Sequence, residues 1–404
     1  MNLKKAFYRV YQTAFKVVMG TNLFNWKEPE LLEGAGSVRK LPEFVKSKGL
    51  KNILVVTDKG LTGLHLLDGM FEEMEKAGVK YTVFDGVQPN PSIENIEQAR
   101  EAYITNNCEG IIAFGGGSPM DCAKAAGARV TNPKKSVKKM RGLLHIRRPL
   151  PPLFAVPTTA GTGSEVTLAA VVTDESTHEK YPINDPKLRP KYAVLDPELT
   201  LGLPPHITST TGMDALTHAV EAYIGRSNVA NTAEYAEKAV KLIFENIETA
   251  YADGKNVQAR QNMLKASYYA GMAFTRAYVG YVHAIGHNLG GFYHVPHGLA
   301  MATILPHVLD YYGDKAYARL AKLAVISGVK TDGTDEEKAK AFIAEIRNMN
   351  ARMNIPTGFD CIKDEDISTI AQRALKEGNP LYPVPKIMDI TDCMALIKEL
   401  QITK

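Results

Sequence analysis

The second half of the chain concentrates side chains that bind metals. Seven of the ten histidines lie between residues 206 and 307, and four of them fall within the stretch YVHAIGHNLGGFYHVPHG, residues 281–298. Histidine is a modest helix former that seldom clusters for packing reasons alone. The stretch therefore raises the question of a metal site. Its four histidines are His283, His287, His294 and His297.

Helical spacing groups several of these side chains. Asp214 and His218 in GMDALTHAVE are spaced i, i+4 and so share one helix face, and His283 and His287 repeat that spacing. A lone histidine on a helix is more often a core residue, but an Asp-x3-His pair with further histidines favours a metal. The four cysteines are scattered without a C-x-x-C pair. An N/O site suits iron, zinc, manganese or nickel, and the spacing does not choose among them.

A glycine run in the first half could hold a phosphate. In IIAFGGGSPMD, Gly115–Gly117 follow an apolar strand pattern, and we expect Ser118 to cap a helix that starts at Pro119, with Asp121 at its third position. Glycines allow close approach of the backbone, and a helix start offers free N–H groups to an anion. A well-capped helix after a tight turn is the alternative, since the run is not a true G-x-G-x-x-G and lacks the usual acidic residue downstream.

Two further polar groups end neighbouring strand patterns. The loop PTTAGTGSEVT supplies small hydroxyl side chains after the pattern PLFAV, and Asp58 closes the pattern NILVVTD. Ligands bind at one edge of a parallel sheet, so the loop could grip a second part of the same ligand and Asp58 could accept hydrogen bonds from ribose hydroxyls. Together these features favour a dinucleotide. The loop hydroxyls are those of Thr158, Thr159, Thr162, Ser164 and Thr167.

The elements that must position these residues fall into two groups. Strand and helix patterns alternate over the first half, which predicts a mostly parallel α/β sheet. After Pro204-Pro205 long helical patterns such as residues 211–225 and 232–254 dominate. At 404 residues the chain is long enough for two domains. We therefore expect an α/β dinucleotide-binding domain over residues 1–203 and an all-helical domain over 204–404.

Bulk properties limit the partners and the compartment. Hydrophobic residues make up 45% of the chain and the net charge is +4, which matches an ordinary globular protein without a strong nucleic-acid field. The first 26 residues predict an amphipathic helix better than a signal peptide, and no stretch approaches the roughly 20 apolar residues of a membrane span. Scattered cysteines suit reduced thiols. We expect a cytoplasmic protein with no membrane and no nucleic-acid partner.

One basic run bears on the expected absence of a nucleic-acid partner. Lys134 to Arg148 holds seven Lys and Arg residues within fifteen positions. The run has no interleaved aromatic residues, so a solvated loop is favoured over a nucleic-acid patch. Attraction of a phosphate-bearing ligand is the remaining alternative.

Four motifs resemble the iron-containing (group III) alcohol dehydrogenase family. They occur in the family's order, over roughly residues 25 to 400, and they are GGGSPMDCAK, PTTAGTGSEVT, GMDALTHAVE and VHAIGHNLGGFYHVPHG. The resemblance implies a dinucleotide-binding α/β domain, a helical metal domain, a cleft between them and a homodimer. It also implies NAD(H), with NADP as the alternative, and a divalent metal, for which Fe²⁺ is expected and Zn²⁺ is the alternative.

The resemblance also assigns residues by position. Asp214, His218, His283 and His297 match the metal ligands, while His287 matches a histidine near the nicotinamide and is the expected catalytic residue. His294 matches no ligand and is expected in the cleft or at the surface. The implied cofactor contacts are Asp58, Asn90, Gly116, Gly117, Ser118, Thr158, Thr159, Thr167 and Lys180.

The implied activity is hydride transfer between NAD(H) and a small primary alcohol or aldehyde, with a metal acting as Lewis acid. A glycerol-dehydrogenase-like polyol enzyme is the nearer rival. A lyase resembling dehydroquinate synthase is the more distant rival, because its phosphorylated acid substrate needs a basic cluster and the motif stretch offers mainly Arg276. Arg276 and Tyr278 also depart from the family's small or amide residues, which predicts a narrower or more polar substrate pocket. A non-enzymatic reading would leave the Asp/His cluster unexplained.

Overall fold

The computed structural model describes residues 3–21, 27–177 and 179–402. The chain divides into two compact units, one of residues 25–202 and one of residues 203–404 together with 1–24. The sequence analysis expects a boundary near residue 203 and assigns the N-terminal helix to the α/β domain. In the structure this helix is grouped with the helical unit.

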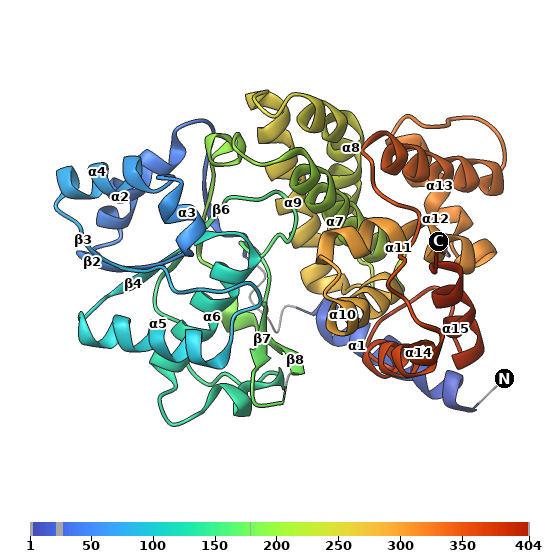
Figure 1. Cartoon of the computed structure of the whole chain (residues 1–404), viewed down its shortest axis with the longest axis horizontal. Coiled ribbons are helices and arrows are strands. Elements are labelled where there is room, and N and C mark those ends of the chain that lie inside the picture. The colour runs from blue at the N-terminus through green and yellow to red at the C-terminus, as the bar shows by residue number, and fades with distance from the viewer. Residues whose placement is uncertain (1–2, 22–26, 178, 403–404) are drawn as a thin grey trace. The chain divides into compact units, whose positions relative to one another are not determined.

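The α/β unit is built on a six-stranded sheet in which every pairing is parallel (Figure 1). Apolar runs predict buried strands, and the three central strands are buried over nearly their whole length. A mostly parallel sheet is thus confirmed. In spatial order the strands are β1 (Glu30–Glu33), β9 (Tyr192–Leu195), β6 (Leu153–Pro157), β4 (Gly110–Gly115), β2 (Asn52–Val56) and β3 (Lys80–Phe84).

Helices cover both faces of this sheet because successive strand residues point to opposite sides. Ile53 and Val55 pack in one core with α2 (Ser37–Ser47) and α4 (Asp68–Ala77). Leu54 and Val56 pack in the other core with α5 (Ile93–Thr105) and α6 (Gly117–Thr131). Because β2, β4 and β6 pair in parallel, their carboxyl ends lie side by side at one edge of the sheet.

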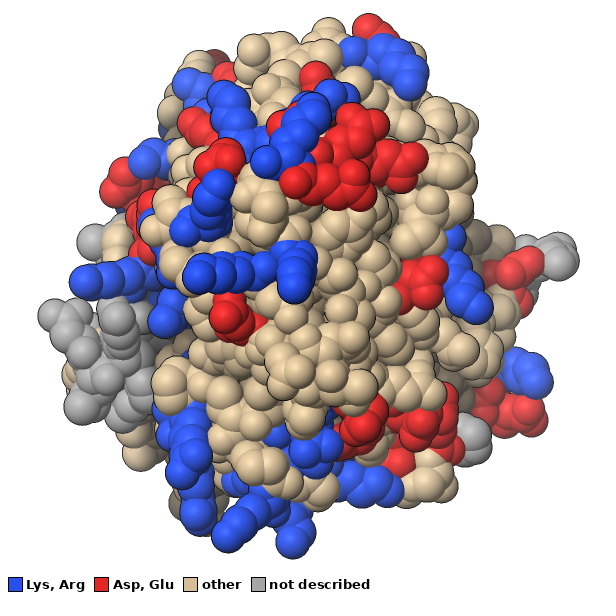
Figure 2. Space-filling model, turned by 90° about the vertical axis from the view of Figure 1, so that its left-hand side faces the viewer, with Lys and Arg blue, Asp and Glu red and all other residues tan. Residues whose placement is uncertain are grey.

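A smaller sheet carries part of the basic run. The strands β7 (Ala169–Asp174) and β8 (Glu179–Asn184) pair antiparallel, and β5 (Gly142–Leu143) adds to β8. Lys138 lies 2.7 Å from the carboxylate of Asp174, and Arg141 lies 2.7 Å from that of Glu179. On the face shown in Figure 2, basic and acidic side chains are intermixed. The ion pairs support the solvated loop, and the absence of a nucleic-acid role stays a prediction.

The helical unit is arranged around one buried helix, α7 (Pro205–Ile224). All thirteen residues from Gly212 to Ile224 are buried, as expected for a helix enclosed by other helices. It packs against α8 (Ala230–Ala252), α9 (Val257–Ala277) and α11 (His297–Tyr312). The remaining helices are α10 (Tyr281–Tyr293), α12 (Tyr317–Ile326), α13 (Asp335–Arg352), α14 (Asp364–Gly378) and α15 (Ile390–Glu399). No described helix is both long and apolar enough to cross a membrane.

The N-terminal helix α1 (Leu3–Gly20) is hydrogen-bonded to residues 382–385. Arg9 donates hydrogen bonds to the carbonyl oxygens of Val384 and Pro385, at 2.6 and 2.7 Å. The buried Gln12 side chain donates to the carbonyl of Tyr382 at 2.7 Å. These bonds satisfy carbonyls of the segment between α14 and α15, so α1 is an integral part of the helical unit.

A buried carbonyl that loses its donor costs about 1–3 kcal/mol. We expect Gln12→Leu, which keeps the size of the side chain, to lower the free energy of unfolding by about that amount. The measurement is the urea midpoint of the variant against Thr13→Ala, which changes an exposed residue of the same helix. Equal midpoints for the two variants would contradict the role of Gln12.

Candidate active site

Three helices bring four metal-binding side chains together. The central helix α7 supplies Asp214 and His218, α10 supplies His283, and α11 begins with His297. One ligand atom from each lies within 4.8 Å of all the others. Asp214 Oδ1 lies 3.3 Å from His297 Nε2, and 3.8 Å from both His218 Nδ1 and His283 Nε2. The carboxylate is thus the centre of the group.

The inner atoms of this group lack hydrogen-bond partners. Asp214 Oδ1, His218 Nδ1 and His283 Nε2 are buried, and none makes a hydrogen bond within the described part of the chain. A buried polar atom without a partner costs free energy, and an unpaired buried charge costs more. These three atoms, together with His297 Nε2, fit a cation bound by one oxygen and three nitrogen ligands.

Burial also sets the protonation of the ligands. It lowers the pKa of His218 to about 3 and holds the pKa of His283 well below its usual value. Burial acts to raise the pKa of Asp214, but the surrounding histidines outweigh it and keep the pKa below the usual range. His218 and His283 are therefore neutral and the carboxylate of Asp214 is charged near neutral pH, which are the forms that bind a metal.

His287 lies beside this group without joining it. Its ring stacks on that of His297, with centroids 5.3 Å apart and planes 18° from parallel. Its Nδ1 is 2.7 Å from Glu377 Oε1, and Tyr382 donates to the same oxygen at 2.9 Å. The side chain is 40% exposed, close to the 42% of His297, whereas Asp214, His218 and His283 are buried. His294 is exposed and ends α10 with a φ of 56°.

The sequence analysis misses two carboxylates that support these histidines. Glu221 is buried on α7, and its Oε2 lies 2.6 Å from His283 Nδ1. A signal for Glu221 was available, because residues 214, 218 and 221 follow the i, i+4, i+7 spacing of one helix face. Glu377 lies 90 residues from His287 in the sequence, and no local pattern connects the two.

The glycine run forms a helix start at the carboxyl end of β4, but not with the expected boundaries. The helix α6 begins at Gly117 with Gly116 as its N-cap, and no side chain caps it. Ser118 is thus inside the helix, where its hydroxyl accepts a hydrogen bond from the backbone N–H of Asn90 at 3.1 Å. The expected capping role of Ser118 is wrong, because the backbone turns two residues earlier. The uncapped N–H groups suit an anion.

Other predicted cofactor residues surround this helix start. A Cβ added at Gly116 would lie 3.4 Å from Thr159 Oγ1, and the N–H of Thr158 donates to the carbonyl of Gly115 at 3.1 Å. A Cβ at Gly115 would lie 2.6 Å from the ring of Pro119, so this close turn needs glycine. Asp58 caps α3 (Lys59–Gly63) after the neighbouring strand β2, accepting from the N–H of Leu61 at 3.0 Å.

Two predicted contacts lie farther along the chain. Thr167 is buried and its hydroxyl accepts a hydrogen bond from the buried Lys124 at 3.0 Å, which gives it a structural role. Lys180 lies opposite Thr173 in the β7–β8 pair, and the N–H of Thr173 donates to the carbonyl of Pro91, next to Asn90. Contact of Thr167 and Lys180 with a cofactor stays a prediction.

Tyr278, one of the two departures from the family pattern, has a packing role in the structure. Its ring meets that of Phe15 in α1 edge to face, with centroids 5.0 Å apart, and also lies near Tyr382. Tyr278 has a φ of 64°, an uncommon value for an aromatic residue. The tyrosine therefore packs the N-terminal helix onto the helical unit.

Known proteins match the chain over most of its length. The family profile described as iron-containing alcohol dehydrogenase matches residues 29–197, and the C-terminal profile of the same family matches residues 208–400. The 1,3-propanediol dehydrogenase of Citrobacter freundii is 40% identical over 367 residues, which cover 89% of this chain and 95% of the relative.

Two more proteins extend the comparison. The NAD-dependent methanol dehydrogenase of Bacillus methanolicus is 34% identical over 373 residues, or 92% of this chain and 97% of the relative. A crystal structure of a 1,3-propanediol oxidoreductase superposes with a TM-score of 0.90 at 36% identity, covering 94% of this chain and all of the other. The chain belongs to the iron-containing alcohol dehydrogenase family.

Proposed function

We propose that the protein is a metal-dependent oxidoreductase that transfers a hydride between NAD(H) and a small primary alcohol or its aldehyde. The observation that carries the proposal is the convergence of three buried, unpartnered ligand atoms, from Asp214, His218 and His283, with His297 completing the group. The names of relatives, which act on 1,3-propanediol and methanol, support a small alcohol as the substrate. The expected metal is Fe²⁺, with Zn²⁺ as the alternative.

The roles that we propose for the metal, the cofactor and the protein follow from the charges and hydrogen bonds of the residues. When bound, the metal supplies a Lewis acid for the substrate oxygen and the nicotinamide supplies the hydride acceptor or donor. Asp214 provides a fixed negative charge, and the imidazoles of His218, His283 and His297 provide ring nitrogens as ligands. Asp214, His218 and His283 are already in the protonation state that a metal requires, so binding the cation requires no proton to leave these three groups.

We infer that His287 exchanges a proton with the substrate. With Nδ1 donating to the Glu377 carboxylate, a neutral His287 ring carries its lone pair on Nε2. That nitrogen can accept the hydroxyl proton during oxidation and return it during reduction. Its exposed side chain connects the proton to solvent, which the buried Asp214, His218 and His283 cannot do.

The α/β unit supplies the groups that suit a dinucleotide. The uncapped start of α6 at Gly116 and Gly117 presents N–H groups to a pyrophosphate. The hydroxyls of Thr158 and Thr159 border the same turn, and Asp58 offers a carboxylate to a ribose. Nothing favours the dehydroquinate-synthase-like alternative over this assignment. A cytoplasmic location and a homodimer remain part of the proposal.

Metal dependence is the first prediction. Chelation should abolish oxidation of 1,3-propanediol and other small primary alcohols, followed as NADH absorbance, because the Asp/His group then lacks its cation. Activity should return with divalent metal, and best with Fe²⁺. Full activity in protein shown by elemental analysis to contain no metal would refute the proposed mechanism, and turnover of glycerol alone would favour the polyol rival.

The second prediction separates His287 from His297. His287→Ala should keep a near-stoichiometric metal content and lose turnover by about 100-fold, a magnitude typical of general acid–base catalysis. His297→Ala should lose metal and activity together. Metal content measured beside kcat decides the assignment, and the opposite pattern would show that the two roles are reversed.

The third prediction concerns the choice between NAD and NADP. The Asp58 carboxylate should accept from a ribose 2′-OH and repel a 2′-phosphate, so we expect NAD to be preferred. Asp58→Asn keeps an oxygen for the cap of α3 while removing the charge, and should relax the preference. Asp58→Gly removes both the capping oxygen and the charge. The ratio of kcat/KM for the two cofactors tests this, and a tenfold preference of the unmodified enzyme for NADP, about 1.4 kcal/mol, would contradict the placement of Asp58.

A further inference from the structure

We infer that Glu221 is a positioning residue for the metal site, which holds His283 in the single tautomer that can bind a metal. The inference rests on the proposed metal centre and adds a residue outside its four ligands. Its basis is a buried contact, with Glu221 Oε2 only 2.6 Å from His283 Nδ1. The other ring nitrogen, Nε2, is the one that faces Asp214.

Hydrogen bonds to the backbone fix the orientation of the carboxylate. Glu221 Oε1 accepts from the N–H of Val282 at 2.9 Å, and the N–H of Gly280 also donates to the carboxylate. With Oε1 accepting from Val282, Oε2 is the oxygen that faces His283. The Nδ1 of His283 must then carry the ring's proton, and the lone pair falls on Nε2. Carboxylate partners of this kind orient metal-binding histidines and raise their basicity.

The backbone is shaped to admit this carboxylate. A Cβ added at Gly280 would lie 2.6 Å from Glu221 Oε1, although the φ of −136° at this position is open to any residue. Glycine is therefore required here by the approach of Glu221 and not by backbone conformation. The start of α10 and the carboxylate of α7 can meet only because residue 280 has no side chain.

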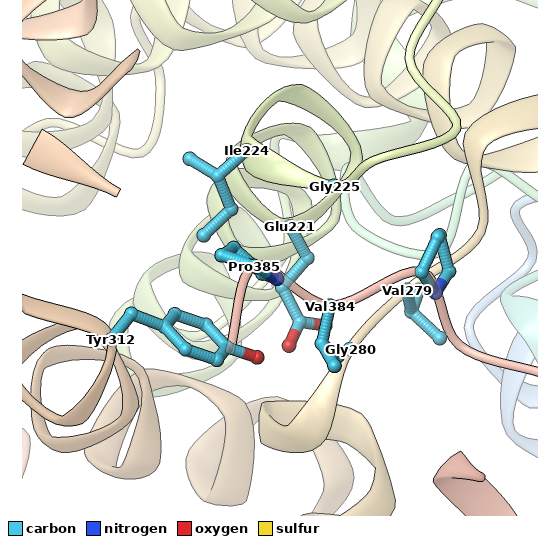
Figure 3. Close-up of a pocket in the computed structure, with 9 residues that line it drawn as sticks. Glu221, Ile224, Gly225, Val279, Gly280, Tyr312, Val384 and Pro385 are labelled. Atoms are coloured by element: carbon cyan, nitrogen blue, oxygen red, sulfur yellow. The ribbon is translucent and has the colours of Figure 1, made fainter. Parts of the chain in front are cut away.

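Among the described residues, the pocket behind Glu221 adds no further hydrogen bond to the carboxylate. Figure 3 shows Glu221 and the hydroxyl of Tyr312 facing one another, with Gly280 and Val384 beside them. The space among the lining residues is too small for a water molecule. Tyr312 Oη makes no hydrogen bond in the described part of the chain. The carboxylate thus depends on the two backbone N–H groups and His283.

The variant that tests the inference is Glu221→Gln, which keeps the size and shape of the side chain. If the amide oxygen replaces Oε1, the NH₂ group faces His283 Nδ1 and drives the ring proton to Nε2, where a metal should bind. If the amide is reversed, its NH₂ group opposes the N–H groups of Val282 and Gly280. Both orientations penalise the metal-binding form.

We expect Glu221→Gln to weaken binding of Zn²⁺ or Co²⁺ by roughly 10- to 100-fold, the range found when such a partner is removed. Affinity is measured by competition with a chromophoric chelator at fixed pH, and the thermal midpoint of the metal-free protein should match that of the unmodified chain. Gly280→Ala, which displaces the carboxylate, should weaken metal binding as well. Tyr312→Phe alters the same pocket without touching His283 and should bind metal as the unmodified protein does.

The outcomes separate this inference from the function on which it rests. Tight metal binding by the unmodified protein with equal affinity in Glu221→Gln would overturn the role of Glu221 and leave the metal centre intact. An equal loss of affinity in Tyr312→Phe would also overturn it, because the effect would then belong to the pocket as a whole. Failure of the unmodified protein to bind either metal would refute the proposed function itself.

Discussion

The burial of one carboxylate governs the organisation of the helical unit. Asp214 sits on a helix that other helices enclose, and a charge in such a place costs several kcal/mol unless it is compensated. No Lys or Arg side chain pairs with it among the described residues. The fold instead surrounds it with ring nitrogens of three histidines. Buried polar atoms without partners are unfavourable, so the cation that the proposed function requires would also stabilise the helical unit.

The two carboxylates next to the histidines divide those rings into two kinds. Glu221 is buried, uses both oxygens and has no access to water, so it can only hold a ring in place. Glu377 is partly exposed and shares its oxygen with a tyrosine hydroxyl, so the ring it supports remains open to solvent. Under the proposed function, similar Glu–His pairs would support a fixed ligand in one case and a proton-exchanging group in the other, and burial distinguishes the two.

The sequence predicts the parts of this site that local periodicity controls. The Asp214–His218 pair could be identified because both side chains lie one helical turn apart, and the glycine run could be placed at a strand end because β4 is an uninterrupted apolar pattern. The Ser118 cap is wrong because a good capping residue lies two positions after the turn that the glycines permit. The Glu377–His287 pair and the docking of α1 depend on tertiary contacts across 90 and more than 370 residues, which no local pattern encodes.

The packing of α1 against residues 382–385 affects the order in which the helical unit can assemble during synthesis. The family profile begins at residue 29, so this helix precedes the matched region, and its hydrogen-bond partners lie at residues 382–385. Translation runs from the N-terminus to the C-terminus, so α1 is made before these partners, and the entire α/β unit is synthesised between them. The hydrogen bonds that hold α1 can therefore form only after residues 382–385 have been made.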